Sequence, residues 1–499
     1  MSAIITEKFR KHNANQFHES FSEASASVYY LFIGKATAFT SSTTTGSDSS
    51  PPTPADSVGE THFYAWDSML AAKKITSSDI SFAIPRRNWS NGTVFDMYKH
   101  NISSSNTATS GASNLFDSTF YFMTSDFRVY KVLDNNGGTA FSGSEPTSES
   151  TSAFALGGYV LKYMYKISAS DASKFNTTDF IPVATDSTVS TAATDGAIES
   201  LVVTGGSGYT DGTYYAAVFG DGTNQGTSSG AVVRITVSSG SIQSFGLTAG
   251  SDTTIESAGD SYTFGTVNLG DDFIFSDSSL SSSTTLGASG SGGAIEVIIS
   301  PKEGHGNDAV TELGGHYVMT ATTLSQAEGD DLTTANDFRQ VGLVVDPTTF
   351  GTSTVASATT ARQTSVVKGT TSGTFEADEQ IVQTSTGAVG KVVEYDSDRS
   401  LLYYQQERFS GFGTSATNSG VTAFSGTNLI TGQTSGATLT PSSDTETVTL
   451  ANSNTLTLTT GYANPELQPD SGNIIYLENR KPIQRDSDQT EDIKLIIEF

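Results

Sequence analysis

The sequence predicts a mainly β protein, with a multi-layer β-sandwich core, a few short helices and inserted small β modules. Thr and Tyr favour strands, and the chain holds 19 tyrosines among many threonines. Its 48 glycines, together with abundant Ser, Asn and Asp, supply the turns that many short strands require. A chain of 499 residues is too long for one compact core, so we expect several domains.

The N-terminal part predicts helices around one buried strand. Residues 6–23 predict a short helix with three phenylalanines near one face and a threonine at its start. The apolar run VYYLFI at 28–33 predicts a buried strand, and residues 61–74 suit a second helix. Beyond it, Pro85 argues against a helix and Asn91-Gly92 marks a tight turn.

Strand signals recur through the rest of the chain. Alternating apolar residues over 118–134 predict a hairpin, which the Asn-Asn-Gly-Gly run at 135–138 is expected to close. Residues 157–168 predict a further strand, and 334–347 predict a loop that enters a buried strand. The alternating segment 493–499 ends the chain, and a terminal strand of this kind is expected to be paired within a sheet.

Two internal repeats follow residue 195. In the first, IESLVVTGGSGYTDGT from Ile198 has a weaker, split copy that begins at Ile242. In the second, FEADEQIVQTSTGA at 375–388 recurs as FSGTNLITGQTSGA at 424–437. We expect each copy to form a small hairpin of strand, glycine turn and strand. Because a single hairpin is marginally stable, paired copies are expected to pack on each other.

Composition restricts the partners and the chemistry. Acidic residues outnumber basic ones by 53 to 26, for a formal charge of −27, and such a surface repels phosphate, so no nucleic-acid partner is expected. The absence of cysteine excludes disulfides, thiolate zinc sites and thiol nucleophiles. No stretch approaches roughly 18 apolar residues, so no membrane partner is expected. The polar N-terminus lacks the apolar core of a signal peptide, which predicts synthesis in a cytoplasm.

Five short patterns resemble ligand-binding or catalytic motifs, and each has a simpler structural interpretation. GHGNDAVTELGGH at 304–316 holds two histidines and two acids but suits a glycine-rich turn before a strand. GTSSG at 226–230 lacks the strand and helix of a nucleophile elbow, and GGSGYTDG at 205–212 lacks a P-loop lysine. The acids at 270–273 and 329–331 lack EF-hand spacing. We therefore predict no catalytic, cofactor-binding or metal-binding residues and no cofactor.

The C-terminal segment SGNIIYLENRKPIQRDSDQTEDIKLIIEF, Ser471 to Phe499, carries the strongest family signal. It resembles the ending SGxxIYxENRxPIxxxxDQTExIxxxxxF of baseplate wedge subunit eight of T-even-type contractile-tail phages. Earlier blocks resemble the same family in the same order. They are EKFRKHNANQF with YYLFIGK, IPRRNW at 84–89, GGYVLKYMYKI at 157–167 and DFRQVGLVVDP at 337–347.

The resemblance implies a specific role. Members of this family are mostly β, form a homodimer within each wedge, and join inner wedge proteins to peripheral ones that carry fibres. It implies a structural protein of the virion tail baseplate, assembled in the host cytoplasm, that acts in tail assembly and contraction and is no enzyme. The repeat regions lie outside the resemblance and are similar to modules in virion proteins of phages that infect cyanobacteria.

The resemblance and the repeats together divide the chain into five parts. They are an N-terminal core part at 1–195, an inserted β repeat module at 196–298, a core continuation at 299–359, a second inserted repeat module at 360–450, and a C-terminal core part at 451–499.

Charged and aromatic residues in the family blocks are the candidates for an interface or structural role. Paired arginines are unusual in so acidic a chain, and they are expected to form bidentate bridges to carboxylates, either within the subunit or across an interface. The candidates are Arg86, Arg87, Trp89, Asp337, Arg339, Tyr476, Glu478, Asn479, Arg480 and Gln489.

Two other functions remain open. One is a carbohydrate- or receptor-binding virion module, suggested by the Ser/Thr/Gly-rich β composition, the repeats and potentially exposed aromatics at Tyr209, Tyr214 and Tyr215. The other is a polysaccharide-degrading virion enzyme, which needs two facing carboxylates among the 53 acids.

Overall fold

A computed structural model describes residues 6–23, 26–39, 46–55, 60–325, 337–408, 421–450, 455–483 and 490–499. Strands make up 42% and helices 11%, so the predicted mainly β class is confirmed. The chain forms two compact units: the first contains residues 1–16, 81–319 and 496–499, and the second contains residues 17–80 and 320–495. Each unit has hydrophobic cores of its own.

A four-stranded antiparallel sheet in the order β4-β5-β7-β6 lies in the first unit. Its strands are β4 (Tyr121–Met123), β5 (Arg128–Asp134), β6 (Phe154–Leu156) and β7 (Tyr159–Lys166). The strand predicted over 157–168 is thus confirmed as β7. The predicted hairpin forms between β4 and β5, but residues 124–127 close it. The expected closure at 135–138 is wrong, because Thr124 makes the local hydrogen bonds of the tighter turn and the glycines follow β5.

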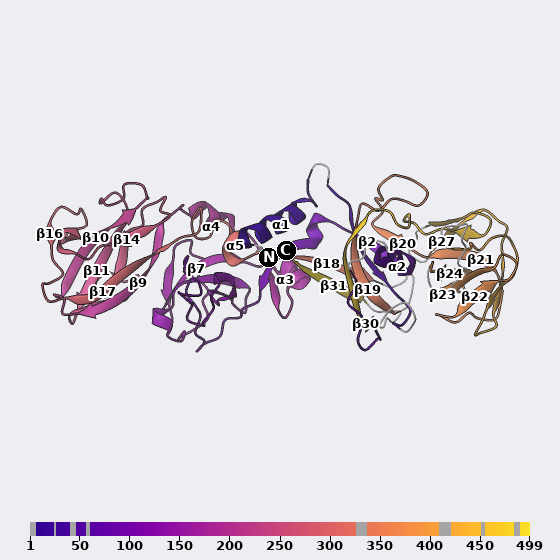
Figure 1. Ribbon diagram of the computed structural model, residues 1–499, viewed down its shortest axis with the longest axis horizontal. Coiled ribbons are helices and arrows are strands. Elements are labelled where there is room, and N and C mark those ends of the chain that lie inside the picture. The colour runs from indigo at the N-terminus through magenta and orange to yellow at the C-terminus, as the bar shows by residue number, and fades with distance from the viewer. Residues whose placement is uncertain are drawn as a thin grey trace. The chain divides into compact units, whose positions relative to one another are not determined.

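A larger antiparallel sheet of nine strands completes the first unit, with the main order β12-β11-β10-β14-β17-β9 (Figure 1). The strands are β9 (Ile198–Ser207), β10 (Gly212–Gly220), β11 (Val232–Ser238), β12 (Ser241–Ile242), β13 (Thr254–Ser257), β14 (Gly265–Val267), β15 (Ile274–Phe275), β16 (Ser283–Thr284) and β17 (Ser291–Ile299). The first repeat was expected to form a hairpin, but β9 pairs with β17 while β10 pairs with β11 and β14. That expectation is wrong, because distant strands outcompete the neighbour across the glycine turn.

The small sheet of the first unit has apolar side chains on both faces. Val132 and Leu161 belong to the core formed with β4 and Ile84, whereas Leu133 and Val160 belong to the core of the nine-stranded sheet. Successive side chains of a strand point to opposite faces, so one sheet serves two cores. This arrangement is the multi-layer β packing that the sequence predicted.

The second unit contains a five-stranded sheet in the order β20-β2-β1-β19-β30. Its strands are β1 (Tyr29–Gly34), β2 (Met69–Ile75), β19 (Phe338–Val345), β20 (Thr360–Arg362) and β30 (Asn473–Ile483). All six residues of β1 are buried, which confirms the strand predicted from VYYLFI, and β19 confirms the buried strand after residue 337. The helix predicted over 61–74 is wrong in its second half, because α2 (Glu60–Ser68) ends where β2 begins to pair with β1.

Six strands of the second unit form a closed ring (Figure 1). The strands are β21 (Ser365–Ser372), β22 (Gln380–Gln383), β23 (Ala388–Asp396), β24 (Leu401–Gln405), β25 (Ile430–Gly432) and β26 (Thr438–Pro441), with β29 (Tyr462–Ala463) added at β21. Pairing of β21 with both β24 and β26 closes the ring around one apolar core. Closure leaves few unpaired strand edges in this ring.

The second repeat forms two paired hairpins, as the sequence predicted, and these contribute four of the six ring strands. Each copy is a hairpin, β22–β23 and β25–β26, and β22 pairs with β25 to join them. Phe375 and Phe424 are each 5% exposed, and both lie in the ring core. Gly387 and Gly436 have φ of 74° and 70° at the matching turns, a conformation that favours glycine.

The remaining elements are helices, a two-stranded sheet and a further four-stranded sheet. They are α1 (Glu7–Glu19), α3 (Ala169–Phe175), α4 (Ser187–Ala192), α5 (Ala309–Leu313), β3 (Ile80–Pro85), β8 (Phe180–Pro182), β18 (Tyr317–Ser325), β27 (Glu446–Thr449), β28 (Thr455–Leu458) and β31 (Thr490–Glu498), with 3-10 turns at Ser77–Asp79, Leu115–Asp117, Asn136–Gly138 and Asp271–Phe273. Strand β3 pairs with β8 and β31 pairs with β18 in the four-stranded sheet, whose order is β31-β18-β3-β8, so the C-terminal strand is paired as predicted.

The first helix is shorter than predicted, since α1 ends at Glu19. The Thr6 hydroxyl accepts from the Phe9 amide at 3.3 Å, as expected of a residue at the helix start. The Phe21 ring stacks on Tyr29 with centroids 4.1 Å apart, whereas Phe9 is 53% exposed. The predicted turn at Asn91-Gly92 is present, and Gly92 has φ of 81°.

Replacement of Gly342 by alanine tests the close packing of β19. A Cβ atom there would lie 2.6 Å from the Tyr476 carbonyl oxygen and closer still to the Phe32 ring. We expect Gly342→Ala to destabilise the second unit by about 1–3 kcal/mol, measured as a lower denaturant midpoint. Gly270→Ala is the control, because its Cβ has no neighbour closer than 3.2 Å. Equal stability of the two variants would contradict the packing argument.

Candidate interface residues

The loop after β3 uses its two arginines to hold main chain. The Arg86 guanidinium donates to the Thr177 carbonyl at 2.9 Å, and Arg87 donates to the Phe116 carbonyl at 2.8 Å. The Arg87 guanidinium also lies 4.5 Å from the centre of the Tyr121 ring, a cation–π contact. The carboxylate bridges expected for these two arginines do not occur among the described residues. Arg86 also donates to the Asn88 side-chain oxygen at 2.9 Å, and one terminal nitrogen of Arg87 is buried without a hydrogen-bond partner in that part of the chain.

Trp89 continues this loop into the β4 sheet. Its amide donates to the Met123 carbonyl at 2.8 Å, and its ring meets Phe141 edge-on with centroids 5.9 Å apart. The indole nitrogen is buried and has no hydrogen-bond partner among the described residues. A buried donor of this kind is costly unless a further group accepts from it.

Arg339 forms a second anchored position, within the second unit. Its side chain is 9% exposed, and its NH2 nitrogen lies 2.9 Å from the Asp48 carboxylate and 3.9 Å from that of Asp337. It also donates to the Ala36 carbonyl. These contacts pin the chain after β1 against the start of β19, because a nearly buried guanidinium must keep all of its partners.

Four candidates lie on β30, which is the outermost strand of its sheet. Between Leu343 and Val344 the register shifts, and Ile475 is the extra residue on β30 with 47% exposure. Such a bulge twists an edge strand, and Pro482 near its end removes one donor. The strand therefore carries features that discourage indiscriminate pairing along its outer side.

Some side chains on β30 face solvent, and others contact neighbouring segments of the chain. The Tyr476 hydroxyl donates to Glu478 at 2.9 Å, and Arg480 lies 3.7 Å from the same carboxylate with its side chain 45% exposed. Asn479 instead accepts from Gln340 at 2.8 Å and donates to the Pro52 carbonyl at 2.9 Å. Burial raises the pKa of Tyr476 to about 12, and the Glu478 carboxylate adds to this shift.

The structure thus separates the candidates into two kinds. Arg86, Arg87 and Arg339 are held by internal contacts, whereas Glu478 and Arg480 reach solvent. Gln489 lies outside the described residues.

The segment 304–316 contributes to a buried charge cluster. The Lys131 ammonium lies 2.8 Å from the Glu312 carboxylate, and both side chains are at most 2% exposed. The Gly306 amide donates to the other Glu312 oxygen at 2.7 Å, and Lys131 lies 3.9 Å from the centre of the Tyr98 ring. Burial lowers the pKa of Lys131, and the nearby Glu312 carboxylate opposes this shift. A pair so enclosed is structural, since no substrate reaches it.

His305 completes this cluster but is not bonded to it. Its Nδ1 lies 3.9 Å from Glu312, and neither ring nitrogen has a hydrogen-bond partner in the part of the chain that the structure describes. Burial, with the charges of Lys131 and Lys162, holds the pKa of His305 well below its usual value. The imidazole is therefore neutral in the folded protein at neutral pH.

The other residues of the 304–316 segment have separate roles. Asp308 caps α5 by accepting from the Thr311 amide at 3.1 Å, and His316 lies 3.7 Å from Glu7. A short helix thus precedes the strand where only a turn was expected. Across the described ranges no three His, Asp or Glu side chains are placed to hold a metal ion.

The remaining glycine-rich patterns lie in β structure. GTSSG at 226–230 is a turn before β11, and GGSGYTDG at 205–212 joins β9 to β10 with no helix. The acids at 270–273 begin a 3-10 turn, and those at 329–331 lie outside the described residues. None of the described helices is long and apolar enough to span a membrane.

Sequence reasoning missed the strongest arginine bridge. Arg408 donates to Asp67 at 2.7 Å and to both oxygens of Asp470, at 2.5 and 2.9 Å. It also missed β30 as a strand and Lys131 as a buried cation. One signal was present for Lys131, since it lies between apolar residues in a strand pattern.

Comparison with known families places part of the chain in a phage protein family. The sequence model of the family Phage-Gp8, described as Bacteriophage T4, Gp8, matches residues 3–144 and 442–499. No curated protein matches the chain. The matched residues include the blocks near the N-terminus, IPRRNW and the C-terminal segment, whereas the blocks at 157–167 and 337–347 lie outside them.

Removal of the buried imidazole tests its effect on stability. The unfolded chain takes up a proton on His305 below about pH 6.5, whereas the folded chain does not, so folding stability falls as pH drops through that value. One such group contributes at most about 1.4 kcal/mol per pH unit. We expect His305→Leu to reduce the acid-side slope in denaturant titrations from pH 8 to pH 5. The exposed His12→Leu is the control, and an unchanged slope in His305→Leu would disprove this role.

Proposed function

We propose that this chain, of which residues 3–144 and 442–499 match the phage Gp8 family of baseplate wedge subunits, is a member of that family and a structural joint linking inner wedge proteins to peripheral ones. The protein is a structural component of the virion tail baseplate, and its family implies other baseplate proteins as partners. Beyond this structural role, we propose three finer points: the subunit connects inner to peripheral wedge proteins, it forms a homodimer, and it has no catalytic activity.

The position of the family-matched C-terminal segment supports this proposal most directly. It forms β30 and β31, and each is the terminal strand in the order of its sheet. Edge strands offer unpaired main-chain groups to another chain, and pockets for alternate side chains add specificity. The outward Glu478 and Arg480 side chains of β30 can select a partner through complementary charge.

The anchoring contacts supply the rigidity that a joint requires. Arg339 and Arg408 hold loops of the second unit through carboxylates, and the closed ring leaves few edges that could open. A stable interface of about 1,200–2,000 Å² needs such preorganised surfaces, since ordering a loop on binding would weaken it.

Arg480→Ala tests whether β30 lies at an interface. Among the residues that the structure describes, Arg480 makes one long ion pair, so the substitution should leave the folded subunit intact. We expect the dimer dissociation constant, measured by sedimentation equilibrium, to rise about fivefold, which corresponds to roughly 1 kcal/mol. Binding to purified wedge proteins is measured in parallel.

Lys302→Ala is the matched control, because this basic side chain is 89% exposed in the first unit. It should change neither the dimer nor the wedge complex. A wild-type protein that is strictly monomeric and joins no wedge protein would refute the proposal, and an unchanged Arg480→Ala dimer would exclude β30 from the dimer interface.

Deletion of residues 493–499 tests the terminal strand. It removes the buried Ile493 and Leu495 and the Arg10–Glu498 ion pair of 2.6 Å. We expect weaker dimerisation or wedge assembly, monitored by sedimentation and by electron microscopy of assembled wedges. Glu498→Gln is the milder companion, because it loses only the ion pair and keeps the strand. Normal assembly after the deletion would contradict the assigned role of β31.

A further inference from the structure

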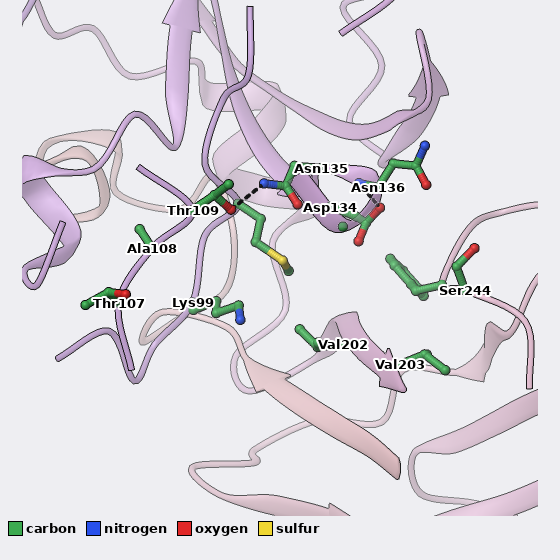
Figure 2. Close-up of a pocket in the computed structure, with 13 residues that line it drawn as sticks. Lys99, Thr107, Ala108, Thr109, Asp134, Asn135, Asn136, Val202, Val203 and Ser244 are labelled. Carbon is green, nitrogen blue, oxygen red and sulfur yellow. Dashed lines mark hydrogen bonds between the residues drawn. The ribbon is translucent and has the colours of Figure 1, made fainter. Parts of the chain in front are cut away.

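A cavity of about 380 Å³ lies within the first unit, beside the turn that follows β5. The segments 97–99, 107–109 and 134–137 form one part of its wall. Val202 and Val203 of β9, together with Ser244 and Phe245, form the other (Figure 2). Small-molecule sites begin at about 300 Å³, so the space suits a small ligand.

Two opposite charges face this cavity without pairing. Lys99 makes no hydrogen bond or ion pair with any described residue, and Figure 2 shows its side chain extending into the space. Within the described ranges, Asp134 accepts only from the Asn136 amide, at 2.9 Å through Oδ2, and no donor there reaches Oδ1. Burial raises the pKa of Asp134 to about 6, and the Asn136 amide and the charge of Lys99 act against this rise.

The turn that carries Asp134 is held rigidly. The Asn135 side chain is 2% exposed, and it donates to the Phe95 carbonyl at 2.9 Å and to the Thr109 hydroxyl at 3.1 Å. It also accepts from the Gly138 amide at 3.1 Å. A carboxylate on such a turn is positioned before a ligand arrives, which lowers the cost of binding.

The rest of the wall combines apolar surface with hydroxyls. Met97, Ala108 and Phe245 are buried, and Val202 and Val203 are half-buried beside them. The exposed Thr107 and Ser244 lie in the same wall. A ligand therefore meets an apolar surface, two hydroxyls and the opposite charges of Asp134 and Lys99 together.

This combination selects a neutral polyhydroxyl ligand. A phosphate or other anion would approach Asp134 unfavourably, and a simple cation would approach Lys99 unfavourably. A purely apolar ligand would leave both charges dehydrated and without partners. Two neighbouring hydroxyls satisfy both groups, because one donates to the carboxylate while the other accepts from the ammonium, and the C–H face of the ring covers the valines and the phenylalanine.

We propose that this cavity is a saccharide-binding site, in which Asp134 and Lys99 hold adjacent hydroxyls of one sugar ring. Its wall joins residues inside the family match, 97–137, to residues outside it, 202–245. The site thus requires residues of the nine-stranded sheet, which lies outside the family match. Its existence is therefore independent of the proposed baseplate role. It gives a second activity to a structural subunit, namely recognition of a glycan.

The cavity is not lined by Tyr209, Tyr214 or Tyr215, the potentially exposed aromatics that the sequence suggested for glycans. Tyr214 is 8% exposed and donates to the Thr210 carbonyl, and the Tyr209 hydroxyl accepts from the Gly293 amide at 2.9 Å. Both hydroxyls are thus used within the nine-stranded sheet; Tyr214 is buried, and Tyr209 and Tyr215 are half-buried.

Saturation-transfer NMR and titration calorimetry on the full chain test the proposal. The probes are glucose, galactose, mannose, N-acetylglucosamine and their common disaccharides, with inorganic phosphate and glycine as non-saccharide probes. We expect at least one neutral saccharide to bind, and Asp134→Asn and Lys99→Met each to weaken it about tenfold or more, because each loses a charged hydrogen bond. Ser244→Trp should abolish binding by filling the cavity from its exposed rim.

Matched controls keep the result specific. Asp272→Asn and Lys302→Met change exposed charges elsewhere in the same unit and should bind as the wild type does. Circular dichroism identifies any variant that fails to fold. If Asp134→Asn fails to fold, Ser244→Trp still gives an independent test of the cavity. Binding of no saccharide, binding of phosphate or glycine alone, or full affinity in Ser244→Trp would overturn the proposal. Dimer and wedge assays are separate, so either proposal can fail alone.

Discussion

Pairing of strands from distant parts of the sequence is the constraint on which this protein depends. In the second unit, β1 lies between β2 and β19, and β30 from near the C-terminus adds to β19, so segments starting at residues 29, 69, 338 and 473 share one sheet. A buried amide without a partner is costly, so β1, buried along its whole length, requires both neighbours. Hydrophobic residues make up only 36% of the sequence, so the hydrogen bonds between paired strands and a few large aromatic side chains define the cores.

The same constraint shapes the surfaces that remain. The six-stranded ring of the second unit closes through β21 and β24, so its strands pair with one another. The five-stranded sheet stays open, and its outer strand β30 carries a bulge, a proline and charged side chains. An open edge with these features suits one selected partner better than many, which fits the proposed role in baseplate assembly.

Several buried or half-buried charged residues in this acidic chain serve architecture. Arg87 and Arg339 hold loops, and the Lys131–Glu312 pair lies fully inside a core with a neutral His305 beside it. Removal of one partner from such a pair typically costs about 3–5 kcal/mol, because the other charge stays buried. Lys99 and Asp134 are the exception, since they face a cavity and are not bonded to each other, and this contrast distinguishes a binding site from an anchor.

Local pattern in the sequence determined the mainly β class, the strand of VYYLFI, the turn at Asn91-Gly92, and the two hairpins whose Phe, Ile, Gly and Ala positions repeat between 375–388 and 424–437. Those features depend on side chains a few residues apart. Tertiary structure decided that residues 69–75 are a strand and no helix, that β9 pairs with β17 across the first repeat, and that β30 is a strand at all. It also placed Lys131 against Glu312, and Lys99 and Asp134 around one space. The partners in these cases lie up to hundreds of residues away, so no local propensity encodes them, and the hydrogen bonds and burial they provide outweigh local preference.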